Sequence, residues 1–248
     1  DEDERIFKLW YFGGPGEEPH FTGIGYAWSE DGISWHKPSL GLYPYRGSTD
    51  NNICFQSPTG LQLFMIGTVS LGLADHFTVI KDPREPDPAR RYKGWTLVYW
   101  AEDGCSRKIP VYSPDGIHWT IGERPVSYPV RDESCILIDD ADPDPSRRIK
   151  VYGNPNADVA LGHVDMGYGP DVERMQPNPA NPVFAPGLEH TLHLFSVLRY
   201  RDYYLALYDY NFWQDYDGLR GDTAVREIDP RVPEPKTGAF VGDVRLAV

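Results

Sequence analysis

The sequence repeats itself about every 57 residues, and this period constrains the fold more than any other feature. One copy runs from Asp75 to Lys93 and the next from Asp132 to Lys150, and their acidic starts lie 57 positions apart (132 − 75). Each copy ends in D-P-x-R-R-x-K, and the two stay in register without a gap. A fixed period of about 20 to 50 residues or slightly more is typical of solenoids and propellers.

Weaker copies of the same unit occur elsewhere in the chain. Asp3–Tyr11 and Arg201–Tyr208 match the strand that contains R-R-x-K, and the turn S-x-D-G-x-x-W occurs at Ser29–Trp35 and Ser113–Trp119. The turn follows the strand at a nearly constant distance, so we count four units. In this turn the glycine permits a positive φ, and the Asp can accept hydrogen bonds from local amides.

Short segments rich in β-branched and aromatic residues, bounded by Gly, Pro, Asp or Asn, indicate strands. They are Ile6–Phe12, Thr96–Trp100, Cys135–Ile138, Lys150–Tyr152, Leu192–Leu198 and Tyr203–Tyr208. No spacer has an amphipathic helical pattern, so a parallel βαβ architecture is disfavoured. Four strands per unit describe a propeller blade. We therefore predict an all-β fold, a β-propeller with about four blades in this chain, and a single domain over residues 1–248.

Composition narrows the classes of partner. The net charge of −13 argues against nucleic acid and against an anionic membrane surface, because both require clustered Lys and Arg. The 3 cysteines show no metal or redox spacing, and the 7 histidines include no H-E-x-x-H pattern. Nucleotide-binding and serine-esterase motifs are also missing, so we expect no cofactor and no metal. We expect a soluble protein, and the sequence does not indicate its compartment.

A run of aspartates in the third unit has the spacing of a calcium loop. Asp140, Asp142 and Asp144 follow the D-x-D-x-D pattern of an EF-hand. However, Pro145 stands where the loop needs Gly, and Val151 stands where it needs Glu. A solvated turn is the favoured interpretation.

Acidic residues precede the first strand of three consecutive units. They are Asp75 in the second unit, Asp132 and Glu133 in the third, and Glu189 in the fourth. The first strand of each propeller blade lines the central axis, so we expect these carboxylates to face one cavity. Glycoside hydrolysis needs two carboxyl groups, one on either side of the scissile bond, and a third can shift their pKa values. The alternative is that these acids only cap strands or are solvated.

The ends of the sequence suggest a piece of a longer protein. The first residues already resemble a middle strand of a blade, and the last residues stop where a further turn is expected. The inner strand of the first unit, with any acid of its own, would then precede Asp1.

Several motifs together resemble the five-bladed β-propeller glycosidase superfamily, which includes glycoside hydrolase families 43 and 32, and most nearly a group of bacterial glycosyl hydrolase-like proteins. They are W-H-K-P-S-L-G-L (35–42), G-S-T-D-N-N-I (47–53), F-T-V-I-K-D-P (77–83), R-Y-K (91–93) and S-P-D-G-I-H-W (113–119). The likeness spans most of residues 1–153 and is weak beyond them.

This resemblance implies roles for the acids. In families 43 and 32 a first-blade Asp is the base or nucleophile, a second-blade Asp tunes pKa, and a third-blade Glu is the acid. By order, Asp75 would take the second role and Glu133 the third. Glu189 also resembles the family 43 acid that precedes a Y-Y-L strand, so either Glu could be the acid. We expect the substrate to contact four further residues: Asn52, His76, Arg131 and His190.

The leading hypothesis is a glycoside hydrolase acting on a furanoside or similar glycan. If the protein is a hydrolase, its expected partner is a carbohydrate substrate. The alternative is a non-catalytic propeller that binds carbohydrate or protein. A sialidase-like enzyme would need an arginine cluster for the substrate carboxylate. Arg46, Arg131 and Arg199 are the candidates, and their spacing does not unite them.

Overall fold

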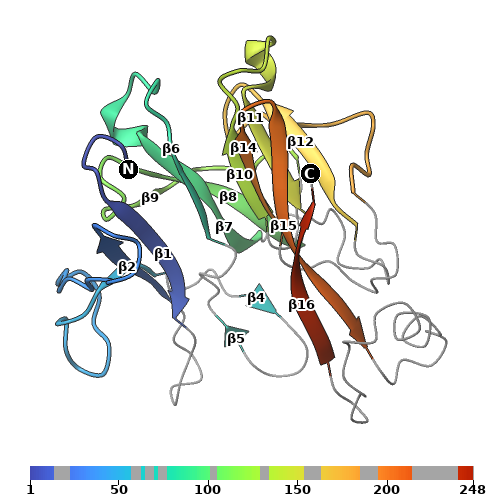
Figure 1. The fold of residues 1–248 in the computed structure, drawn as a ribbon. Helices are drawn as coiled ribbons and strands as arrows, with labels where there is room; N and C mark the ends of the chain where they lie inside the picture. Colours follow the sequence, from blue (N-terminus) through green and yellow to red (C-terminus); the bar gives the residue numbers. More distant parts are fainter. Residues whose placement is uncertain are drawn as a thin grey trace. The chain divides into compact units, whose positions relative to one another are not determined.

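The computed structural model of the chain (Figure 1) describes residues 1–13, 23–56, 63–64, 70–71, 77–100, 105–128, 134–153, 163–184, 195–213 and 240–247. All strand pairs in these residues are antiparallel. The chain divides into two compact units, Asp1–Ser127 and Tyr128–Val248. The assignment of residues 1–248 to a single domain stays a prediction.

Unit 1 contains two large sheets and a short hairpin. The first sheet has the order β1-β2-β3, with β1 at Phe7–Gly13, β2 at Gly23–Ser29 and β3 at Ile53–Gln56. The hairpin pairs β4 (Leu63–Phe64) with β5 (Ser70–Leu71). The second sheet has the order β6-β7-β8-β9, with β6 at Thr78–Lys81, β7 at Tyr92–Trp100, β8 at Cys105–Ser113 and β9 at Thr120–Ile121.

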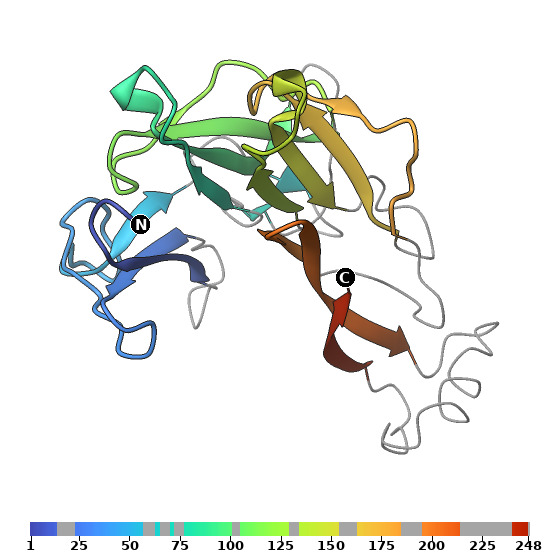
Figure 2. The same cartoon turned by 45° about the horizontal axis from the view of Figure 1, so that its top comes forward.

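Unit 2 contains the other two sheets. The third sheet has the order β10-β11-β12-β13, with β10 at Ser134–Ile138, β11 at Ile149–Gly153, β12 at Asp165–Gly169 and β13 at Gln176–Pro177. The fourth has the order β14-β15-β16, with β14 at Phe195–Tyr200, β15 at Tyr203–Trp213 and β16 at Phe240–Ala247. Figure 2 shows these last three strands side by side, coloured from orange to red.

Strands follow one another through each large sheet in the order of the chain, which is the up-and-down arrangement of a propeller blade. The four sheets correspond to the four units counted in the sequence. Each of the six predicted strands overlaps a strand of the structure, and residues 192–194, the start of one of them, lie outside the described residues. Two single turns of 3-10 helix, at Pro88–Arg90 and Pro145–Arg147, are the only helical segments in the part of the chain that the structure describes. The fold class is therefore confirmed as an all-β propeller.

Aromatic residues form the core of unit 1. Trp10 of β1 packs against Tyr26 and Trp119, and its indole N–H donates to the carbonyl of Gly116 at 2.7 Å. Gly116 has a φ of +83°, and a Cβ there would lie 2.6 Å from Trp10 Cζ2. Only glycine satisfies both conditions, so the S-x-D-G turn of the second sheet is shaped to receive a tryptophan from the first.

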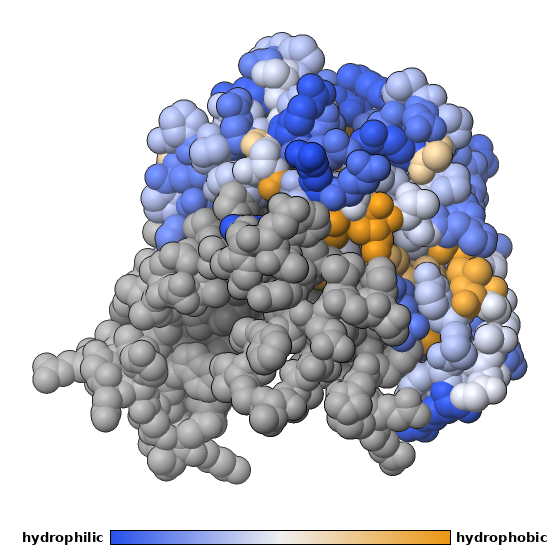
Figure 3. All heavy atoms as spheres, turned by 180° about the vertical axis from the view of Figure 1, so that it is seen from behind, coloured by the Kyte–Doolittle hydropathy of each residue, from blue (hydrophilic) through white to orange (hydrophobic). Residues whose placement is uncertain are grey.

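The described residues contain no helix long and apolar enough to cross a membrane. In the view of Figure 3 their surface is mainly hydrophilic, with hydrophobic side chains gathered in a few patches. This pattern agrees with the high acidic content of the sequence.

Candidate functional site

The predicted catalytic residues Asp75, Asp132, Glu133 and Glu189 lie outside the described residues, as do His76, Arg131 and His190. Their roles therefore stay predictions. The strands that follow them are described, and the contacts of these strands define the surroundings of the candidate site.

Each candidate acid precedes an edge strand. β6 begins at Thr78, after Asp75, and β14 begins at Phe195, after Glu189. β10 begins at Ser134, the residue bonded to Glu133. In all three sheets this strand is the first in chain order and occupies one edge, as expected for the strand nearest a propeller axis.

The edge strands β10 and β14 meet near their starts in unit 2. The amide of Val197, the third residue of β14, donates to Cys135 Sγ at 3.3 Å, and Cys135 Sγ donates to the carbonyl of Val197 at 3.4 Å. Burial raises the pKa of Cys135, so this thiol is a packing group and not a nucleophile. The chain segments that carry Glu133 and Glu189 therefore lead into two strands whose first residues are in contact.

Sequence reasoning missed a set of polar residues at the same end of the third sheet. Tyr128 donates from its hydroxyl to Asp165 Oδ2 at 3.3 Å, and Asn181 Nδ2 donates to that hydroxyl at 3.3 Å. His163 Nε2 lies 3.4 Å from Asp165 Oδ1. These residues belong to no motif, and no signal in the sequence connects positions 128, 163, 165 and 181.

Asn52 is the one predicted substrate contact that the structure describes. Its Nδ2 donates to Tyr11 Oη at 2.6 Å and to the carbonyl of Tyr26 at 2.7 Å. Both amide hydrogens are thus used to connect β1, β2 and the start of β3. Its neighbour Asn51 accepts from the amide of Ile53 and donates to the carbonyls of Tyr43 and Ser48. The N-N pair stabilises this loop, and a role for Asn52 toward substrate stays a prediction.

At the opposite end of the strands, two sheets hold a buried lysine between two carboxylates. Lys93 Nζ lies 3.1 Å from Asp82 Oδ2 and 2.5 Å from Glu85 Oε2. In the next repeat Lys150 Nζ lies 2.6 Å from both Asp139 Oδ2 and Asp142 Oδ2. The conserved spacing of R-R-x-K in the two copies is therefore explained by structure rather than by catalysis.

Asp139 is fully buried and has two further side-chain partners. Arg199 Nη1 donates to its Oδ1 at 2.5 Å, and the Tyr204 hydroxyl donates to its Oδ2. Burial alone would raise the pKa of Asp139, but hydrogen bonds from Lys150, Tyr204 and Arg199 outweigh it and lower the pKa to about 2. Arg199 is thus committed to an internal carboxylate, which weakens the case for an arginine cluster of the sialidase kind.

The D-x-D-x-D run has protein partners at every position. Asp140 Oδ1 accepts from Arg148 Nε at 2.6 Å, Asp142 binds Lys150, and Asp144 Oδ1 accepts from the amide and hydroxyl of Ser146. Asp144 thereby caps the 3-10 turn that begins at Pro145. These side chains stabilise the connection between β10 and β11.

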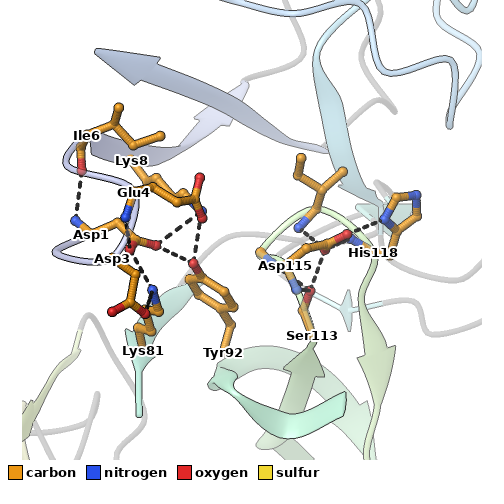
Figure 4. A network of polar contacts seen from close by, with 12 residues as sticks. Asp1, Asp3, Glu4, Ile6, Lys8, Lys81, Tyr92, Ser113, Asp115 and His118 are labelled. Atoms are coloured by element: carbon orange, nitrogen blue, oxygen red, sulfur yellow. Dashed lines mark hydrogen bonds and ion pairs between the residues drawn. The ribbon is translucent and has the colours of Figure 1, made fainter. Parts of the chain in front are cut away.

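The first sheet has a related network, shown in Figure 4. The carboxylate of Asp1 lies 3.2 Å from Lys8 Nζ and 2.5 Å from Lys81 Nζ, and it accepts from the Tyr92 hydroxyl. Lys8 also donates to Tyr92 Oη at 2.8 Å. Lys81 and Tyr92 belong to the second sheet, so this network connects consecutive sheets of unit 1, as Asp139 does in unit 2.

The S-x-D-G turns form as their residues predict, as Figure 4 shows for the second of them. Asp115 Oδ1 accepts from the amides of Ile117 and His118, both at 2.8 Å, and Oδ2 lies 2.7 Å from His118 Nδ1. Burial opposes ionisation of Asp115, but the hydrogen bonds from His118, Ile117 and Ser113 lower its pKa to about 2. Asp31 makes the equivalent bonds to Ile33 and Ser34.

A third turn of this kind escaped sequence analysis. Asp171 Oδ1 accepts from the amides of Glu173 and Arg174 at 3.0 and 2.8 Å. The segment reads G-P-D-V-E-R-M, which retains the Asp but lacks the Ser, Gly and Trp of the other turns. The Pro-Asp pair, which follows R-R-x-K at nearly the same distance as in Ser113–Trp119, was the signal that could have revealed it.

Known proteins were compared with the chain at the level of sequence and of structure. No protein-family model matches the sequence, and no curated protein matches it. Solved structures do match. A GH130-family glycoside hydrolase that targets β-1,2 mannosidic linkages in Candida mannan has a TM-score of 0.58 at 13% identity, covering 96% of this chain and 62% of that one.

Two further structures resemble the chain to a similar degree. An N-acetylgalactosamine deacetylase from F. plautii, in complex with blood group B trisaccharide, has a TM-score of 0.57 at 11% identity, covering 85% of this chain and 61% of its own. Sucrose-6-phosphate hydrolase from Lactobacillus gasseri has a TM-score of 0.55 at 11% identity, covering 83% and 38%.

These likenesses concern the fold. The chain spans less than two thirds of the length of each of the three proteins, and their activities include deacetylation as well as glycoside hydrolysis. A fold shared by different chemistries does not select one of them. The chain therefore has the β-propeller fold found in five-bladed glycoside hydrolases, with about four of the blades in its 248 residues.

Proposed function

We propose that this protein is a glycoside hydrolase in which one carboxylic acid protonates the leaving oxygen and a carboxylate acts as base or nucleophile. The observation that carries the proposal is the contact between Cys135 and Val197, which joins the second residue of β10 to the third residue of β14. Glu133 and Glu189 precede these two strands. The two candidates for the acid therefore both lead into strands that are in contact, which supports a role for one of them in this part of the chain.

The chemistry sets a distance that the two groups must satisfy. Carboxyl groups about 5–5.5 Å apart serve retaining hydrolases, and groups about 6.5–9.5 Å apart leave space for the water of an inverting reaction. Repulsion between neighbouring carboxylates raises the pKa of one of them, which keeps it protonated as the acid. The order of the acids along the chain assigns the tuning of this pKa to Asp75, and Asp132 is a further candidate.

Glu133→Gln and Glu189→Gln test the proposal on 4-nitrophenyl and 2,4-dinitrophenyl glycosides. Loss of the general acid should lower kcat about 10²- to 10⁴-fold. It should do so mainly for the poorer 4-nitrophenyl leaving group, because a good leaving group needs little protonation. The variant that shows this selectivity identifies the acid.

Glu123→Gln is the matched control, because Glu123 is exposed and lies just after β9, the last strand of the second sheet. Unchanged turnover in both glutamate variants would remove the proposed mechanism. A wild-type chain that binds these glycosides without turnover would instead identify a non-catalytic carbohydrate-binding propeller.

A further inference from the structure

The third sheet has a polar row that the proposed reaction does not yet use. Ser134 of β10 pairs with Gly153 of β11, and Gly153 pairs with Asp165 of β12. Side chains of directly paired residues project from the same face of a sheet. Ser134 and Asp165 therefore project from one face, with a glycine between them, in the row that directly follows Glu133.

Two atoms in this row are buried without a hydrogen-bond partner. They are Ser134 Oγ and Asp165 Oδ1, and neither has a hydrogen-bond partner among the described residues. An unsatisfied buried polar group costs about 1–3 kcal/mol, so such groups are rare and often mark functional sites. Asp165 Oδ1 lies 3.4 Å from His163 Nε2, close enough for the carboxylate to attract a ring N–H, although the contact lacks hydrogen-bond geometry.

The groups behind Asp165 hold it in place. A Cβ on Gly167 would lie 2.5 Å from Tyr128 Cδ1, so the absence of a side chain lets the Tyr128 ring lie against β12 and its hydroxyl reach Asp165 Oδ2. Asn181 fixes the hydroxyl in turn. Its Oδ1 accepts from the amide of Met166 at 2.9 Å, and its Nδ2 donates to the Met166 carbonyl at 3.0 Å.

This chain of contacts determines which ring nitrogen of His163 can meet a ligand. A carboxylate beside Nε2 favours the tautomer with hydrogen on Nε2, which leaves Nδ1 as an acceptor. No hydrogen bond to Nδ1 is present within the described residues. The His163 side chain is 26% exposed, whereas Asp165 Oδ1 is fully covered, so solvent reaches the histidine and not this carboxylate oxygen.

We propose that His163 binds the carbohydrate ligand by accepting a hydrogen bond from a sugar hydroxyl at Nδ1, and that Asp165 and Tyr128 are positioning residues that fix its tautomer and orientation. The inference rests on the proposed function for the class of ligand. It adds a residue that neither the repeat nor the resemblance identifies.

Long-range ¹H–¹⁵N spectra of the full chain, labelled with ¹⁵N-histidine, test the tautomer directly. The His163 signals are assigned by their loss in His163→Ala. We expect the Nε2–H pattern in the wild type and a shift toward Nδ1–H in Asp165→Asn, because the amide can donate to Nε2. A wild-type Nδ1–H pattern, or an unchanged pattern in a folded Asp165→Asn variant, would overturn the positioning role.

Ligand contact is tested with sucrose, methyl β-mannoside and methyl β-galactoside at several times the roughly 1 mM that bounds ordinary KM values. At least one sugar should move the His163 signals and leave those of His118 in place. His118 is a matched control because it also faces an aspartate, Asp115, in an exposed turn. If none of the three sugars moves His163, the inference is wrong.

Kinetics separate this inference from the proposed reaction. On a hydrolysed aryl glycoside, His163→Ala should raise KM about tenfold, the value of one good hydrogen bond, with a smaller change in kcat. Full activity with unchanged KM would overturn the inference and leave the reaction standing. Unchanged turnover in both glutamate variants, with sugar-dependent shifts at His163, would overturn the reaction and leave the binding site standing.

Discussion

The second and third sheets are two copies of one sequence unit, and they agree at one corner and differ at the other. At the corner between their first two strands, each has a capping aspartate, Asp87 or Asp144, on a 3-10 turn, and a buried lysine between two acids. Even the cation–π contacts correspond, with Arg90 over Tyr112 at 4.1 Å and Arg147 over Tyr168 at 4.5 Å.

At the turn between the third and fourth strands the residues have diverged while the bonds remain. Ser113 accepts from the amides of Asp115 and Gly116, whereas the corresponding turn in the third sheet has Gly169 and no such acceptor. In the second sheet His118 Nδ1 contacts Asp115 Oδ2, and in the third sheet Arg174 Nε donates to Asp171 Oδ2. A buried charged corner tolerates little change, whereas an exposed turn keeps only the carboxylate that accepts the backbone amides.

Replacing the buried lysines should give the largest loss of stability, and it tests whether the corners of the two sheets are stabilised in the same way. Lys93→Met and Lys150→Met each leave two carboxylates without their shared cation, which costs about 3–5 kcal/mol for a buried pair. Hydrogen exchange of the β7 and β11 amides would report the loss in each sheet separately.

Lys37→Met is the control for this pair, because Lys37 is exposed, and its effect should stay within about 0.5 kcal/mol. A loss below about 1 kcal/mol in either core variant would show that its corner is not stabilised by the ion pair.

Low pH should give the second-largest loss of stability, at the corner of the third sheet. The pKa of Asp139 is about 2 in the folded chain, below its ordinary value of 3.8, so its contribution to stability is complete above about pH 4 and is lost as the pH falls to about 2. Carboxyl-carbon NMR of Asp139 and exchange of the β10 amides would follow this change.

Arg199→Ala removes one of the three side-chain donors to Asp139 and should raise its titration midpoint toward the ordinary value. A wild-type midpoint near 3.8 would contradict the low pKa.

Substitutions in the turns should give the smallest loss of stability. They separate the contribution of the aspartate, which both turns have, from that of the residues that differ between them. Asp115→Ala and Asp171→Ala each release two backbone amides, a change similar to the loss of a helix N-cap, at about 0.5–2 kcal/mol. Urea unfolding would measure it.

Ser113→Gly, which copies the third sheet, should cost less than Asp115→Ala. The exposed Asp50, whose side chain accepts no hydrogen bond within the described residues, gives the control variant Asp50→Ala. An equal loss in Ser113→Gly and Asp115→Ala would show that the carboxylate is not the dominant group.

Much of the fold could be predicted because repetition and turn chemistry are local properties. The period aligned R-Y-K with R-I-K and thereby located β7 and β11, and the S-x-D-G turns marked where two sheets bend back. The turn at Asp171 was missed because its glycine and tryptophan had been replaced. The two-residue strands β9 and β13 carry no pattern of their own.

The site was harder to predict because it depends on contacts between distant positions. The acids were predicted from their order before edge strands, and that order does not measure the distances between them. Asn52 was inferred from a motif, and its amide proves to connect strands. His163 became visible only when Tyr128, Asn181 and Asp165 came together, and these residues come from separate parts of the chain.

The indole of Trp10 and the bare backbone of Gly116 also have an evolutionary consequence. Any side chain at position 116 would collide with the tryptophan, and any smaller residue at position 10 would leave a cavity beneath the turn and a carbonyl with one donor fewer. Neither residue can change alone without loss. Descendants of this sequence should therefore alter positions 10 and 116 together or not at all, although 106 residues separate them along the chain.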